Sequence, residues 1–587
     1  MSNGDEMRPD GRVLTPETRK LRVATRALRY HLDALPIDYD LDVSGDRFLA
    51  GLAFMFARQR YDCTDSMIGA GFGATVLGSI ARSLFVDGLR WLWIGVQPER
   101  RRSLLGDLLE ERNRICVVLE ETDASCPILA RWFMPLPDVA DLTGQSLTWL
   151  DAPSMPSENE LLHDFLAKSD IDPSPSQTDG VNAALLLRAG TLLDMAGLRG
   201  AVMVLAHAGH GNYLGLQSSL TDDGAPGHDL RADHEALFMQ VAAVGVTATL
   251  LGTANAMPEV WPSDAQQEPF LQKAVDLAED VTTAAVAIHR LGNSRRVPAQ
   301  LKKQRDPQRE KVVLRPRAVL AADDLLPDIN SADAVITAAE AYYDVARSMP
   351  IRPFDYGQPL LHNMLAYGGG HSNLETVMST YDQPGSEVIS VFAARMLLEE
   401  AARLIWRFSD PDEATFKARA KQFFDEYRAR QKKTIDTLTS SGVPRIDAQQ
   451  IFAPPRNVHI ATPNDEIARG RTPLPKISSM LREMGAPYPE PGWLEVAYSL
   501  LSQITHSTPI GHLHTVRVRN GTWHGNELSP EMLSLALDTA CLGSAHLIGL
   551  SAVILTDMSS EALRHREDLL REAAMVHDAA RLVHGLD

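Results

Sequence analysis

Apolar residues in this chain recur mostly at spacings of three and four, the period of an α-helix that buries one face. Leu, Ile, Val, Ala and Trp keep this spacing through long segments of both halves of the sequence. Two stretches are apolar on every side: residues 236–257 carry no charge, and residues 535–555 carry only Asp538 and His546 in their interior. The pattern predicts a mainly α-helical protein with these two stretches as buried central helices.

One helical segment occurs twice in the sequence. Residues 81–93 read ARSLFVDGLRWLW and residues 394–406 read ARMLLEEAARLIW. Asp87 of the first segment stands where the second has Glu400. Five positions are identical in the two segments: Ala81/Ala394, Arg82/Arg395, Leu84/Leu397, Arg90/Arg403 and Trp93/Trp406. We therefore expect two copies of one helix.

Three further matches follow in the same order along the chain. Glu-x-Arg-x-Arg occurs at 110–114 and again at 426–430. The segment VLAHAGHGNYLGL at 204–216 matches LLSQITHSTPIGH at 500–512, and the two apolar helices then match at Ala242/Ala540 and Gly245/Gly543. Four ordered matches predict two pseudo-repeated helical bundles in tandem, one in residues 1–292 and one in residues 336–587.

A basic, proline-containing stretch separates the predicted copies. Residues 293–317 hold nine basic and two acidic residues and three prolines, so we expect a solvent-exposed linker over residues 293–335. Its charge suits docking to nucleic acid or to an acidic protein partner, although a solvated loop explains the same pattern. The one strand signal is residues 512–523, where alternation flanks Asn520-Gly521, and it predicts a small β-hairpin in the C-terminal copy.

The composition and charge of the chain disfavour several classes of protein. The net charge of −19 disfavours broad binding to a phosphate backbone. The N-terminus is polar, the four cysteines have no metal or disulfide spacing, and Arg outnumbers Lys by 46 to 11. These features predict a cytoplasmic bacterial protein that does not enter a membrane and has no cofactor, and they leave a homo-oligomer open.

The repeated helix also carries the first candidate site. Arg395, Glu399 and Arg403 lie at i, i+4 and i+8 on one helix face, with Glu400 beside them. Charges on an apolar helix must pair with one another or hold an anion, because an unpaired buried charge is strongly destabilising. An interhelical ion pair and an anion-binding pocket are both consistent with this pattern.

A second candidate is His506, which ends a predicted helix one turn after Ser502 and suits a general base or a hydrogen-bond donor to substrate. A helix-terminal His is also favoured by the helix dipole alone. In the first copy the corresponding, degenerate set is Arg82, Asp87, Arg90 and His210. His512 and His514, which we expect on one strand face with His524 nearby, lack the carboxylate spacing of a metal site, so no metal is predicted.

Three glycines, Gly368 to Gly370, lack the strand and the Lys-Ser/Thr of a phosphate loop. A hinge or a tight corner between two helices is the expected use for them.

Residues 391–556, with their Arg–acid helix and the later segment YSLLSQITHSTPIGHL, resemble a family of bacterial helical proteins related to HEPN domains. The resemblance fades over residues 81–257. HEPN ribonucleases typically carry R-N-x-x-x-H, and Arg519, Asn520 and His524 match that string. The resemblance implies a defence or stress protein that binds nucleic acid or cleaves RNA.

Two other functions compete with this one. Duplication also builds binding or scaffold proteins for a protein partner, and a pocket between helices suits a metabolic enzyme. In that enzyme Arg395 would hold an anionic substrate and His506 would move a proton. The sequence does not decide whether the protein is an enzyme. The arrangement of Arg395, Glu400 and His506 in space separates the alternatives.

Overall fold

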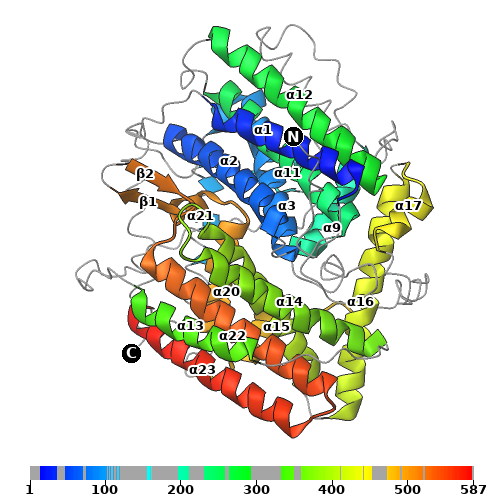
Figure 1. The fold of residues 1–587 in the computed structure, drawn as a ribbon, viewed down its shortest axis with the longest axis vertical. Coiled ribbons are helices and arrows are strands. Elements are labelled where there is room, and N and C mark those ends of the chain that lie inside the picture. Colours follow the sequence, from blue (N-terminus) through cyan, green and yellow to red (C-terminus); the bar gives the residue numbers. More distant parts are fainter. Residues whose placement is uncertain are drawn as a thin grey trace, which may run out of the picture.

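The structure is a computed structural model, and it is mainly helical, as the sequence predicts (Figure 1). It describes residues 14–35, 46–70, 74–101, parts of 103–118, 155–158, 160–161, 196–209, 231–257, 264–291, 332–348, 358–409, 412–440, 442–452, 472–488, 492–519 and 522–584. Residues 293–331 of the predicted linker lie outside this set, and its last three residues, 333–335, already belong to a helix.

The N-terminal half is organised around two helices, α3 (Ala74–Val96) and α11 (Ala232–Ala256), which pack against each other along their length. The helix α2 (Asp46–Ala70) contacts both, and α9 (Ala196–Gly209) packs mainly on α3. The outer helices α1 (Pro16–Asp33) and α12 (Asp264–His289) pack on each other, and α12 also covers α11. A short 3-10 helix, η1 (Pro98–Arg101), follows α3.

In the C-terminal half, α15 (Val388–Phe408) and α22 (Pro530–Leu555) form the central pair. The helix α14 (Gln358–Thr380) contacts both, and α20 (Trp493–Thr505) packs mainly on α15. The outer helices α13 (Asp333–Arg347) and α23 (Ser560–His584) pack on each other. The other helices described in this half are α16 (Glu413–Ser440), α17 (Arg445–Gln450), α19 (Ile477–Gly485) and α21 (Pro509–Leu513).

Glycines allow the central helices of each half to approach closely. A Cβ atom on Gly245 of α11 would lie 2.5 Å from the backbone carbon of Leu84 in α3, and one on Gly252 would lie 2.3 Å from that of Trp91. In the other half, a Cβ atom on Gly543 of α22 would lie 2.8 Å from the backbone carbon of Leu397 in α15. Any larger side chain would push the backbones apart, so the sequence needs glycine at these crossings.

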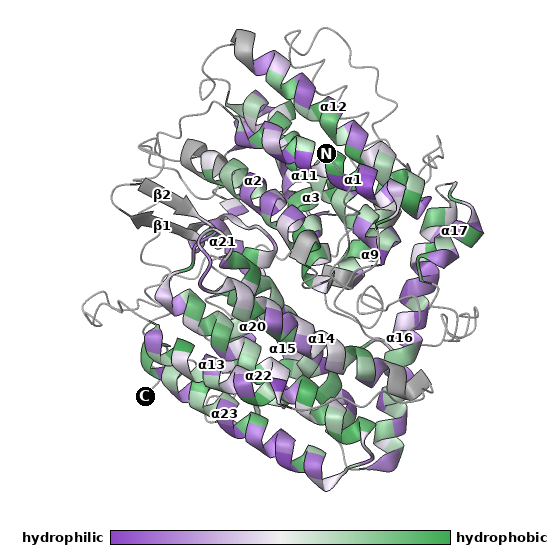
Figure 2. Ribbon diagram, viewed as in Figure 1, coloured by the Kyte–Doolittle hydropathy of each residue, from purple (hydrophilic) through white to green (hydrophobic). Residues whose placement is uncertain are grey.

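The two long apolar helices lie inside the bundles, as the sequence predicts. Ala232–Ala256 and Pro530–Leu555 are long and apolar enough to cross a membrane, but their most apolar windows are 100% and 89% buried inside the protein. Surface helices such as α16 and α23 instead alternate hydrophilic and hydrophobic residues (Figure 2). Burial against neighbouring helices therefore accounts for the apolar character of both segments.

Two details of the C-terminal half differ from the sequence prediction. Gly368 to Gly370 form neither a hinge nor a corner, because they lie inside α14. There, a Cβ atom on Gly370 would lie 3.1 Å from Ile548, so glycine lets α14 pack closely on α22.

His512 and His514 also differ, since they precede the strands. Pro509 and the side chain of Thr508, which accepts a hydrogen bond from the amide of Gly511, start the short helix α21, and His514 ends it. Two short strands follow, β1 (Val516–Arg519) and β2 (Thr522–Gly525), and they pair antiparallel with Arg517 opposite His524.

The two halves meet along α3 and α15, with α14 and α20 also contacting α3 (Figure 1). From the C-terminal half, α21 and β2 pack on α2, and α16 packs on α9. The helix that bears Arg82, Asp87 and Arg90 therefore lies at the boundary between the halves, next to the helix that bears Arg395.

Candidate functional site

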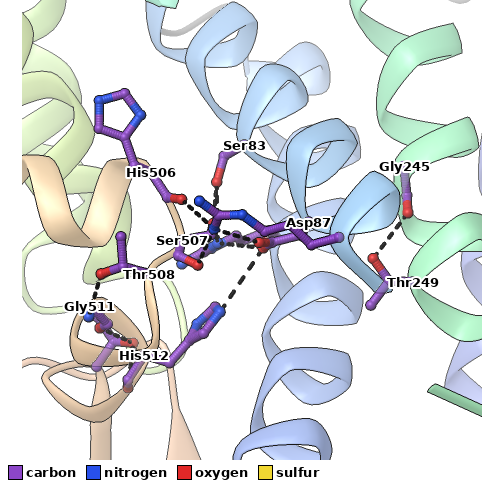
Figure 3. A network of polar contacts seen from close by, with 12 residues as sticks. Ser83, Asp87, Gly245, Thr249, His506, Ser507, Thr508, Gly511 and His512 are labelled. Carbon is purple, nitrogen blue, oxygen red and sulfur yellow. Dashed lines mark hydrogen bonds and ion pairs between the residues drawn. The ribbon is translucent and has the colours of Figure 1, made fainter. Parts of the chain in front are cut away.

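The first polar cluster surrounds Asp87, which α3 places at the boundary between the halves. Its Oδ2 atom lies 3.5 Å from Nη1 of Arg60 in α2 and 4.0 Å from Nε2 of His512 in α21, and its Oδ1 atom lies 3.8 Å from Nη1 of Arg90 (Figure 3). Burial raises the pKa of Asp87 to about 6, although Arg60 and Arg90 oppose the shift. Burial also lowers the pKa of His512, which keeps its ring neutral.

Arg90 links this cluster to the end of α20. Its Nη1 atom donates to the backbone carbonyls of His506 and Ser507, at 3.1 and 3.0 Å. Ser507 has a φ of 51°, in the left-handed region, and its Oγ atom contacts Arg60 and Ser83. Charge-assisted bonds to backbone carbonyls thus hold the helix end and α3 together.

The second cluster runs along α15, where Arg395, Glu399 and Arg403 form ion pairs, as their spacing predicts. Glu399 pairs with Arg403 and lies 3.3 Å from Nη2 of Arg395. Arg395 also donates from Nε to Oγ of Ser502 at 3.1 Å and from Nη2 to the hydroxyl of Tyr498 at 3.0 Å. These bonds orient the side chain of Arg395 toward α20.

Glu400 belongs to the sealed end of this second cluster. It lies 3.2 Å from Nη1 of Arg403 and 2.9 Å from Nε2 of His362, and Nδ1 of His362 contacts Arg407. Burial, with help from Arg407, lowers the pKa of His362 to about 4, so the ring is neutral. Glu400, Arg403 and Arg407 are 3%, 8% and 2% exposed, and they pack as a buried ion-pair network.

A cavity of about 450 Å³ lies between the two halves. Among the residues that the structure describes, the basic ones that line it are Arg82, Arg90, Arg114 and Arg395, and the acidic ones are Asp107, Glu111 and Glu158. The other lining residues are Ser83, Val86, Met155, Pro156, Ser157, Tyr498, Ser502, Gln503, Thr505, His506 and Thr508. The volume lies within the usual range for small-molecule sites.

The structure thus separates the predicted site residues into two groups. Arg395, Ser502 and His506 line the cavity together with Arg82 and Arg90 of the first half. Glu400 and Arg403 do not line it, because they face His362 and Glu399 inside the C-terminal half. Asp87 lies just behind the cavity, beside Arg90.

The structure describes the remaining candidates only in part. His210 and Asn520 lie outside the described residues, and Arg519 and His524 belong to the strands β1 and β2. Among the residues that the structure describes, no group of three or more His, Cys, Asp or Glu is placed to hold a metal ion.

Several residues of the site carry no signal in the sequence. The residues that line the cavity or contact Asp87 from other elements are Arg60, Tyr498, Asp107, Glu111 and Gln503. Some of them lie several hundred residues along the chain from the residues they contact, as Glu111 does from Gln503. The repeat indicates Arg82 and Arg90 only because their counterparts on α15 are recognisable. Long-range contacts of this kind follow from the fold and not from local spacing.

Comparisons with protein-family models, with curated proteins and with solved structures find no match for this chain.

Proposed function

We propose that this protein binds a small anionic molecule in the cavity between two copies of one helical unit. The observation that carries the proposal is that Arg82 and Arg395, which correspond in the repeat, line the same cavity from opposite halves. Arg90, Ser502 and His506 join them there. Several guanidinium groups facing one partly enclosed space form a strong site for a carboxylate or phosphate group.

The duplication is supported by the order and packing of the helices. In chain order, α1, α2, α3, α9, α11 and α12 make the same set of contacts as α13, α14, α15, α20, α22 and α23. The close crossings agree at single residues, because Gly245 meets Leu84 while Gly543 meets Leu397. Leu84 and Leu397 correspond in the repeated helix, and Gly245 and Gly543 correspond in the apolar helices. We infer an internal pseudo-dimer whose interface contains the cavity.

The hydrogen bonds around the cavity leave groups that suit an anion. Arg90 uses Nη1 for Asp87 and for both carbonyls, and its Nη2 atom takes part in none of these contacts. Ser502 accepts a hydrogen bond from Arg395, so its own hydroxyl proton remains for a ligand. Both side chains have fixed partners on one side and face the cavity, which is the arrangement of a preorganised site.

The proposal is tested by thermal unfolding of the full chain in increasing sulfate, followed by circular dichroism. Anion binding to the folded state should raise the Tm with sulfate concentration. Arg90→Gln and Arg395→Gln should each reduce this rise, whereas Arg419→Gln should not. Arg419 is a matched control because it pairs with Glu483 and does not line the cavity.

An equal rise in Tm for the wild type and both cavity variants, all with the same helical signal, would place the anion elsewhere and overturn the proposal. A variant that loses helical signal is replaced by Ser502→Ala. This change removes one hydroxyl from the cavity and keeps every charge.

A second candidate function, binding or cleavage of nucleic acid as in HEPN-related proteins, rests on the R-N-x-x-x-H string. The antiparallel pairing of β1 and β2 brings the strand with Arg519 alongside the strand with His524. Loss of RNA cleavage in the Arg519→Ala, His524→Ala double variant, with cleavage kept in Arg90→Gln, would favour this function over the cavity. Purified protein that leaves RNA intact would speak against it.

A further inference from the structure

Residues 155–158 form part of the cavity lining, and they bring a carboxylate to Arg82. The side chain of Glu158 forms an ion pair with Nη2 of Arg82, and both residues line the cavity. The side chain of Arg82 is 14% exposed and that of Glu158 is 25% exposed. The ion pair therefore lies at the cavity, where a dissolved anion can reach it, and not in the sealed core.

Glu158 is held between two buried anchors. Met155 and Leu161 on either side of it are 2% and 0% exposed. The amide of Leu161 donates to the carbonyl of Ser157 at 2.9 Å, and the amide of Ser157 donates to Oε2 of Glu160 at 2.8 Å, as at the start of a helix. These contacts restrict where the carboxylate of Glu158 can lie.

Arg82 lacks the partners that hold its counterpart Arg395. Arg395 is bound by three side chains of its own half, Glu399, Tyr498 and Ser502. The corresponding positions of the first copy are apolar: Val86, Val202 and Ala206. Among the residues that the structure describes, Glu158 is the one hydrogen-bond acceptor for Arg82. Arg82 therefore depends on the cavity lining for its partner, and Arg395 does not.

Glu158 also uses only half of the guanidinium edge that it faces. The N–H groups of Nε and Nη2 point in the same direction, so one carboxylate, phosphate or sulfate group can accept from both. Glu158 accepts from Nη2, whereas Nε of Arg82 is buried and has no hydrogen-bond partner in the described part of the chain. An anion with two suitably placed oxygen atoms would satisfy both donors.

We propose that Glu158 is an internal anion that occupies Arg82 until the ligand displaces it. The ligand then carries a carboxylate, phosphate or sulfate group, and two oxygen atoms of that group accept hydrogen bonds from Nε and Nη2 of Arg82. Glu158 loses its partner when the ligand binds, and residues 155–158 loosen. The inference rests on the proposed function, because it concerns the same cavity, and it adds the residue that competes with the ligand.

The first test is titration calorimetry of the full chain with sulfate. Glu158→Gln removes the competing charge, so this variant should bind sulfate about fivefold more tightly than the wild type, an effect of the size of one partly exposed ion pair. Glu160→Gln is the matched control, because it removes the same charge from the same segment but Glu160 does not line the cavity. Glutamine there still accepts from the amide of Ser157, and sulfate affinity should not change.

The use of both donors of Arg82 is tested by Arg82→Lys. Lysine keeps the positive charge but cannot offer two parallel N–H groups. Sulfate affinity should fall about fivefold or more, while the weaker binding of chloride, which has one atom, should not fall. Equal losses for sulfate and chloride would contradict the two-donor contact.

The displacement itself is tested by hydrogen exchange of the full chain, followed in peptides that cover residues 155–161. A ligand usually slows exchange at its site, but here sulfate should speed exchange at the amide of Leu161, because Glu158 is released. In Glu158→Gln the exchange should already be fast, and sulfate should leave it unchanged.

Sulfate that binds Glu158→Gln no more tightly than the wild type, or that slows exchange at Leu161, would overturn the inference. If Arg90→Gln and Arg395→Gln weaken sulfate binding in that case, the proposed function stands and the role of Glu158 alone fails. Sulfate binding that none of these cavity variants changes would contradict both.

Discussion

The helices α3 and α15 carry the same Arg, acid, Arg pattern and use it in opposite ways. In α15, Glu399 pairs with both Arg395 and Arg403, and Glu400 joins His362, so most of the set is sealed inside one half. In α3 the position of Glu399 is taken by Val86. Arg90 therefore has no second carboxylate on its own helix and donates to the carbonyls of His506 and Ser507 in the other half.

This difference shows how a single position, Glu399 in α15 and Val86 in α3, changes which groups the neighbouring arginine binds. A carboxylate between two arginines holds both of them within the helix face, and the pairs then contribute to packing. A valine there leaves one arginine to find acceptors across the boundary, where the cavity lies. The pairs within α15 contribute to stability, and the proposed function assigns anion binding to Arg90 of α3, so the two helices should respond differently to mutation.

The largest expected effect is a loss of stability when the buried ion pairs of α15 are broken. Glu399→Ala removes the carboxylate shared by Arg395 and Arg403, and it should lower the free energy of unfolding by about 3–5 kcal/mol, because two buried guanidinium groups lose a paired carboxylate while Glu400 stays beside Arg403. Urea unfolding followed by circular dichroism measures this loss. Val86→Ala at the corresponding position of α3 should cost less, since it removes only apolar contacts and no partner of a buried cation.

A smaller effect is expected at the crossings of the central helices. Gly252→Ala and Gly543→Ala should each lower the free energy of unfolding by about 1–3 kcal/mol, because the added methyl group meets backbone atoms of Trp91 or Leu397. Gly549→Ala, in the same helix as Gly543, is the control, since its methyl group comes closest to the side chain of Arg566, at 2.8 Å, and the nearest backbone atom, the Cα of Arg566, lies at an ordinary contact distance of 3.4 Å. Equal tolerance at all three positions would contradict the close packing in both halves.

The smallest expected effect is a pH dependence of anion affinity that arises from Asp87 of α3 and has no counterpart in α15. Asp87, with a pKa of about 6, faces Arg60, Arg90 and His512. Protonation removes a negative charge beside Arg90, so sulfate affinity should rise as the pH falls through 6, by up to about tenfold. Sulfate keeps its own charge across this range, which makes it a suitable probe.

Titration calorimetry between pH 5 and 8 measures this dependence. Asp87→Asn should bind sulfate tightly at every pH in the window. A wild-type affinity that falls with acid would contradict the role of Asp87.

The parts of the molecule that local spacing controls could be predicted from the sequence. The period of the apolar residues gave the helices, and the i, i+4, i+8 spacing gave the pairing of Arg395, Glu399 and Arg403. The end of α20 at His506 also followed from the sequence. The glycines at 368–370 were misjudged because their effect depends on Ile548 in another helix.

The site itself could be predicted only in part. Arg395, Ser502 and His506 lie together as candidates, but Glu400 and Arg403 turn toward His362 and Glu399, on the sealed side of α15. The place of Glu111 in the cavity went unrecognised because Glu111 meets Gln503 of α20 from nearly four hundred residues away in the chain. Such contacts depend on how the two halves dock, which no local pattern encodes.

The most direct test of the account is anomalous X-ray diffraction from crystals of the full chain soaked in selenate. The account predicts a selenium peak in the cavity between the halves, within hydrogen-bonding distance of Arg90 and the hydroxyl of Ser502. Selenate bound only on the outer surface, with the guanidinium of Arg90 turned away from the cavity, would contradict it.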